Sequence, residues 1–149
     1  MMGLTQAQTK ETQEADGTWI SPEPLHHIQQ EAVRGVWNLC GNSDNQTAIA
    51  EMGGIEMICE LLKSSGDVKV RCQCAGAVAN LALKESAREV LLEQNSHEYL
   101  MELMYEEGEP LACRNAASAL SNLALEPEIR RQLFEMGVVE TMKLLCEDP

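Results

Sequence analysis

Aromatic residues and long apolar runs are both scarce in this sequence of 149 residues. Aromatics make up 3% of the chain although 44% of it is hydrophobic, so the core must be packed mainly from Ala, Leu, Val, Met and Cys, a palette that suits closely stacked helices. No apolar run approaches the roughly 18 residues of a membrane span. The first residues, MMGLTQAQTK, lack the basic and apolar regions of a secretory signal. We therefore expect an intracellular chain, in the cytoplasm or also in the nucleus, with no membrane partner.

Basic residues are scarce as well, with 11 Lys and Arg against 24 Asp and Glu, a net charge of −13. Binding to nucleic acid requires clustered cations that neutralise phosphates and release counterions. We therefore do not expect a nucleic-acid partner.

Motifs of catalysis and metal binding are also missing. The sequence has no G-x-S-x-G, no H-E-x-x-H and no phosphate-binding glycine loop. Its six cysteines lack a secretion signal and metal-ligand spacing, which favours reduced thiols, and Cys40 and Cys74 fall in repeat positions otherwise filled by alanine, as buried small hydrophobes would. We expect no enzyme activity, metal or cofactor. The alternative is an unrecognised Cys/His site that uses Cys59 or Cys113.

The sequence does contain an internal repeat with a period of 42 residues. The stretch AVANLAL around Asn80 is matched by GVWNLCG around Asn38 and by ALSNLAL around Asn122. Residues 73–104 and 115–146 share eleven identities in 32 positions, whereas chance would give about two. An asparagine inside a helix costs a few tenths of a kcal/mol relative to alanine, so its recurrence requires a physical reason.

Turn signals divide each unit into three helices. A long helix carries the recurring asparagine near its end, a short helix follows, and a residue that suits left-handed backbone (Gly53, Asn95 or Gly137) separates it from the third. Long helices are predicted to begin near Pro22, Asp67 and Pro110, and short helices near Ser43, Glu85 and Pro127. The predicted units are residues 21–64, 65–106 and 107–149, after a flexible polar leader over residues 1–20.

A helical wheel places the recurring asparagines on a polar stripe of the long helices, opposite an apolar face. The same sector contains Cys72 and Gly76, and we expect it to be exposed. A carboxamide can pair with the backbone of an extended peptide whatever the peptide's side chains. The predicted partner-binding residues are Asn38, Asn80, Asn122, Arg34, Trp37, Gln73, Arg114, Asn115 and Ser118.

These features resemble armadillo repeats, in the Asn-Leu pairs, the glycine before one helix and the three-helix unit of about 42 residues. The resemblance implies an all-α, right-handed α-solenoid of about three repeats. It also implies a non-catalytic protein-interaction module whose groove binds an extended partner segment. Importin-like relatives have a tryptophan four residues before the asparagine, and here those positions are Arg34, Gly76 and Ser118. Because residues 68–83 and 110–125 contain basic but no acidic side chains, a neutral or acidic segment is the expected partner.

Three alternatives remain open at this point. The recurring asparagines could each bond a loop of a neighbouring repeat and bind no partner. Trp37 could anchor a ligand or pack as a wedge against a missing preceding repeat. The chain could also be a structural section of a larger array or multiprotein assembly, associating end to end or as a homo-oligomer through uncapped apolar ends. The methionines at 52, 57, 101, 104, 136 and 142 are expected in the core.

Overall fold

The computed structural model describes residues 12–13, 19–20, 22–106 and 108–147. Most of the predicted leader, residues 1–20, lies outside the described residues, so its flexibility stays a prediction. Within it, strands β1 (Thr12–Gln13) and β2 (Trp19–Ile20) pair antiparallel, with Thr12 opposite Ile20.

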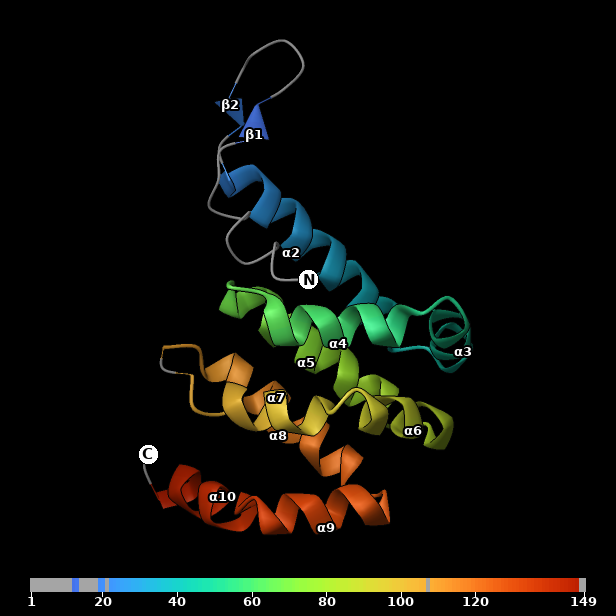
Figure 1. Cartoon of the computed structure of the whole chain (residues 1–149), viewed down its shortest axis with the longest axis vertical. Helices are drawn as coiled ribbons and strands as arrows, with labels where there is room; N and C mark the ends of the chain where they lie inside the picture. Colours follow the sequence, from blue (N-terminus) through green and yellow to red (C-terminus); the bar gives the residue numbers. More distant parts are fainter. Residues whose placement is uncertain (1–11, 14–18, 21, 107, 148–149) are drawn as a thin grey trace.

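Helices make up almost all of the described structure, which is an α-solenoid. Successive units follow one another along the long axis of the molecule in chain order, so that α2 lies toward one end and α9 and α10 lie together at the other (Figure 1). Each long helix is followed by two shorter ones. The helices are α2 (Pro22–Leu39), α3 (Ser43–Glu51), α4 (Gly54–Ser64), α5 (Val68–Leu81), α6 (Glu85–Glu93), α7 (Ser96–Leu103), α8 (Pro110–Leu123), α9 (Pro127–Glu135) and α10 (Val138–Glu147).

The helices begin where the turn signals predict. The Asp67 carboxylate accepts a hydrogen bond of 2.8 Å from the backbone N–H of Lys69 and so caps α5. Pro110 and Pro127 occupy the first turns of α8 and α9, where a missing N–H costs nothing. The predicted starts of the long and short helices are therefore confirmed.

The turn between the two shorter helices of each unit has the same left-handed backbone. The φ angle is +74° at Gly53, +52° at Asn95 and +77° at Gly137. Asparagine tolerates this region better than other residues with a side chain, which explains why Asn95 can replace glycine in the second unit.

The core runs along the stack, with α5 packed between α2 and α8. Cys40 and Cys74 are fully buried, as predicted. Among the methionines, Met101 and Met104 are also buried. The prediction of a core position is wrong for Met52, Met57 and Met136, which are 85%, 46% and 40% exposed. Met52 and Met136 are the C-caps of α3 and α9, where the chain turns at the surface.

Candidate partner-binding surface

The three long helices share a hollow of about 320 Å³ at their surface. Its walls come from successive units, because α2, α5 and α8 lie next to one another. It is lined by Arg34 and Trp37 of α2, by Lys69, Cys72 and Gln73 of α5, and by Glu109 and Leu111 at the start of α8. Three predicted site residues, Arg34, Trp37 and Gln73, are thus brought together.

The indole of Trp37 lies directly over Gly76 of α5. A Cβ atom at position 76 would be 2.6 Å from Cζ2 and 2.8 Å from Cδ2 of the indole, well inside normal carbon contact. Gly76 is therefore required for α2 to approach α5 this closely. The structure also corrects the wedge interpretation, since Trp37 packs against the following unit and not toward a preceding one.

The predicted polar stripe is only partly exposed. Arg34, Asn38, Arg114 and Ser118 are exposed, and Trp37, Gln73, Asn80 and Asn122 are half-buried. The prediction of exposure is wrong for Asn115, Cys72 and Gly76, which are buried. The reason is geometric: an inner long helix packs against a neighbour on each side, so part of its polar sector is covered as well.

Two asparagines of α8 form hydrogen bonds with the preceding long helix. Asn115 Nδ2 donates to the Cys72 carbonyl at 3.0 Å, and Asn122 Nδ2 donates to the Ala79 carbonyl at 2.8 Å. Both bonds join residues 43 positions apart, which is one unit plus one residue. Of the three recurring asparagines, Asn122 therefore bonds a neighbouring repeat, with a helix carbonyl as the acceptor and not a loop; Asn115 forms a similar bond.

Charge is distributed unevenly between the long and the shorter helices. Lys69, Arg34 and Glu109 all line the hollow, and Arg34 also forms an exposed ion pair with Glu31. Arg71 forms a partly buried ion pair with Glu106 at 2.8 Å. The acidic residues of the shorter helices are mostly exposed, including Glu51, Glu56, Glu60, Glu93, Glu98 and Glu102. The acidic excess thus lies mainly on the shorter helices.

The sequence reasoning missed Lys69, Leu111 and Glu109 as lining residues. Lys69 and Leu111 are 42 residues apart and so occupy the same position in successive units. That shared position in the first turn of a long helix, two residues after its N-cap position, was the available signal.

Thiol chemistry does not favour the alternative Cys/His site at Cys59. Burial, with a smaller effect of the Glu56 charge, raises the pKa of the Cys59 thiol to about 12, whereas a nucleophilic cysteine requires a lowered pKa. Burial likewise lowers the pKa of His97. Within residues 22–106 and 108–147, no group of three or more His, Cys, Asp or Glu side chains could hold a metal ion. No helix there is long and apolar enough to cross a membrane.

Residues 42–83 match the family model of the Armadillo/beta-catenin-like repeat. The chain contains an armadillo repeat. The matched segment comprises α3, α4 and α5, so the armadillo repeat places its long helix last. Helices α6, α7 and α8 follow in the same order. The division into units 21–64, 65–106 and 107–149 starts one helix earlier and stays a prediction.

A solved structure is similar over most of the chain. The crystal structure of an engineered protein, determined by a structural genomics consortium, superposes with a TM-score of 0.68 at 29% sequence identity. The match covers 76% of this chain and 47% of the engineered protein, so the chain spans about half of that protein's length. A comparison with curated proteins found no significant match. Together, the family match and this similarity support an α-solenoid that contains an armadillo repeat.

Proposed function

We propose that this chain is a non-catalytic interaction module that binds an extended protein segment along α2, α5 and α8, in the cytoplasm or the nucleus. The observation that carries the proposal is the hollow of about 320 Å³, to which three successive long helices contribute side chains. Such a hollow can receive one side chain of a segment that runs across the helices, while neighbouring helices contact the residues on either side.

The half-buried Trp37 ring and Leu111, which is 38% exposed, supply apolar surface to that side chain. A tryptophan held against a helix backbone is already ordered, so binding to it loses little side-chain entropy. We expect the anchor residue of the partner to be apolar.

The three recurring asparagines would contact the partner's backbone. Asn38 is exposed and Asn80 is half-buried. Asn122 uses one N–H on the Ala79 carbonyl, but a carboxamide has a second N–H and an acceptor oxygen. Bracing and peptide binding are thus compatible in the same side chain. Gln73, Arg114, Asn115 and Ser118 complete the proposed set, with Asn115 acting through its contact with α5.

Local charge favours a neutral or acidic segment. Lys69 and Arg34 flank the hollow, whereas the exposed surface of the shorter helices is acidic. An acidic partner would therefore be attracted to the long helices and repelled elsewhere, despite the net charge of −13.

A selection from a library of extended peptides, followed by calorimetry, tests this function. Acidic and neutral peptides with one apolar anchor should be enriched. Reversing two charges beside the hollow, Arg34→Glu with Lys69→Glu, should weaken binding of an acidic peptide at least tenfold. The matched control, Arg131→Glu with Lys143→Glu, reverses two exposed charges on α9 and α10 and should leave the affinity unchanged. Equal loss in both variants, or equally tight binding of basic peptides, would contradict the proposal.

A second candidate function is structural, as a section of a larger assembly joined through its end faces. The specific observation in its favour is the exposed apolar surface of α9 and α10, where Phe134 is 73% and Val139 is 56% exposed.

A further inference from the structure

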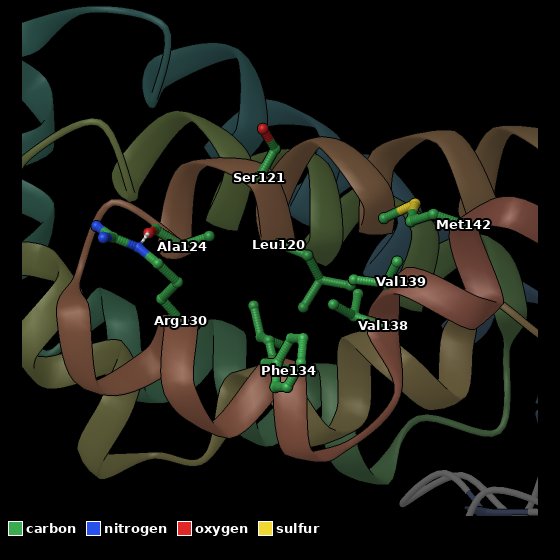
Figure 2. Close-up of a pocket in the computed structure, with 9 residues that line it drawn as sticks. Leu120, Ser121, Ala124, Arg130, Phe134, Val138, Val139 and Met142 are labelled. Atoms are coloured by element: carbon green, nitrogen blue, oxygen red, sulfur yellow. Dashed lines mark hydrogen bonds between the residues drawn. The ribbon is translucent and has the colours of Figure 1, made fainter.

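The last three helices enclose an apolar cavity of about 400 Å³ that opens to solvent. Leu120 of α8, Phe134 of α9, and Val138 and Val139 of α10 point into the same space (Figure 2). Phe134 and Val139 are 73% and 56% exposed, and exposed apolar side chains beside a cavity are typical of a binding surface.

Inside the stack, the equivalent positions are covered by a long helix. In the matched armadillo repeat, α3 and α4 are followed by α5; in the same way, α6 and α7 are followed by α8. The positions 42 and 84 residues before Val139 are His97 and Ile55, which are 2% and 1% exposed. Leu145 is 43% exposed, whereas Leu103, 42 residues earlier, is fully buried. Helices α9 and α10 thus present the surface that a long helix covers elsewhere in the described chain.

The opposite end of the molecule presents a long helix with an uncovered stripe. Ile28 and Leu39 of α2 are 64% and 52% exposed, and Ala32 and Gly35 between them are exposed too. The equivalent residues of the inner long helices are all fully buried. They are Val70, Cys74, Ala77 and Leu81 in α5, and Ala112, Ala116, Ala119 and Leu123 in α8.

We propose that α2 of a second copy of this chain docks on α8, α9 and α10 of the first and completes an armadillo repeat in trans. The junction would have the same geometry as the two junctions inside the chain, in which α5 packs on α2 and α8 packs on α5. This inference goes beyond peptide binding and specifies how the end faces would associate; it shares only Asn38 and Arg114 with the proposed peptide-binding set.

Polar groups at the two faces match in the same register. Inside the chain, Asn122 donates to the Ala79 carbonyl. At the junction, Asn38 of the second copy takes the place of Asn122. Ser121 of the first copy takes the place of Ala79. A second hydrogen bond inside the chain joins Asn115 to Cys72. At the junction, Glu31 of the second copy takes the place of Asn115, and Arg114 of the first copy takes the place of Cys72. Both are exposed and carry opposite charges, and Glu31 also pairs with Arg34 of its own chain, so these two positions are complementary in charge.

The contact must be intermolecular because the two faces are far apart in one chain. They lie at opposite ends of the long axis (Figure 1), so a single chain cannot join its own two ends. Each junction is heterologous, leaves one face of each kind uncovered, and permits further growth.

Sedimentation velocity of the whole chain, from micromolar to millimolar concentration, tests the proposal. The wild type should associate progressively. Phe134→Asp should block one face and Ile28→Asp the other, so each variant alone should sediment as a monomer. Mixed in equal amounts, they should form a dimer and nothing larger, because only one pair of intact faces remains. Leu83→Asp, at a 60% exposed position between α5 and α6 in the middle of the stack, should associate like the wild type.

A wild type that stays monomeric at millimolar concentration would overturn the proposal. Association that persists in Phe134→Asp would also overturn it. So would a mixture of the two variants that stays monomeric, because that result is expected for a symmetric dimer. Thermal melts verify that each variant is folded, and Phe134→Ser and Ile28→Ser replace any charged variant that melts earlier. A charge exchange adds a second readout: Arg114→Glu should weaken association at low salt, and adding Glu31→Arg should restore it.

Discussion

The contact between Trp37 and Gly76 predicts an unusual response to a simple substitution. Replacing glycine by alanine inside a helix normally stabilises a protein by about 1 kcal/mol. At position 76 the new methyl would lie 2.6 and 2.8 Å from two indole carbons, whereas carbon atoms pack at about 3.5–4.0 Å. The indole or α5 must therefore move by roughly 1 Å.

Overpacking of this kind costs about 1–3 kcal/mol, which outweighs the gain in helix propensity. We expect Gly76→Ala to lower the free energy of unfolding by about 1 kcal/mol, which lowers Tm by about 2–4 °C in a chain of this size. Equilibrium unfolding in urea measures the effect.

Gly35→Ala is the matched control, because Gly35 is also in the middle of a long helix but has no neighbouring atom within 4 Å of the place that the new methyl group would take. This variant should gain about 1 kcal/mol. In a Trp37→Ala background, Gly76→Ala should become stabilising too, which gives a coupling energy of about 2 kcal/mol between the two positions. If Gly76→Ala stabilises the wild type as much as Gly35→Ala does, the contact described above is wrong.

Three further predictions concern the braces, the turns and the thiols. Asn122→Ala removes the bond to the Ala79 carbonyl and should cost about 1 kcal/mol in urea unfolding, whereas Asn38→Ala, at an exposed position, should change stability by less than about 0.5 kcal/mol; equal effects would refute the distinction. Gly53→Ala forces a methyl into left-handed backbone at φ +74° and should cost about 1–2 kcal/mol, while Asn95→Gly at φ +52° should be nearly neutral in the same assay. Burial raises the pKa of Cys74 to about 12 and of Cys40 to about 11, against an ordinary value of about 8.5 in the unfolded chain. Because the unfolded chain then loses protons first, stability should fall as pH rises above about 8.5. Cys74→Ala should reduce that slope in a series of melts, and an unchanged slope would contradict the assignment.

The helix ends and turns could be predicted from the sequence because their causes are local. The cap at Asp67 and the left-handed turns at Gly53, Asn95 and Gly137 depend on residues within a few positions of each other. The 42-residue period gave the order of the helices for the same reason, since each unit repeats the same local signals.

Burial on the long helices could be predicted only in part. A helical wheel divides a helix into one apolar and one polar face, but α5 and α8 pack along each other and cover part of the polar face as well. That is why Asn115 is buried and bonds the Cys72 carbonyl. The hollow beside Trp37 could not be predicted from the sequence either, because it depends on the approach of the indole to Gly76, 39 positions away in the sequence.

The position of Trp37 makes it a spectroscopic reporter of one junction. Its indole lies between α2 and the backbone of α5, so its emission depends on whether α2 is seated, and hardly on the helices further along. Replacing Trp19, the other tryptophan of the chain, with phenylalanine would leave a single emitter. A red shift that precedes the loss of helical circular dichroism would then show α2 detaching while the rest of the stack stays folded, and would give the local opening equilibrium directly.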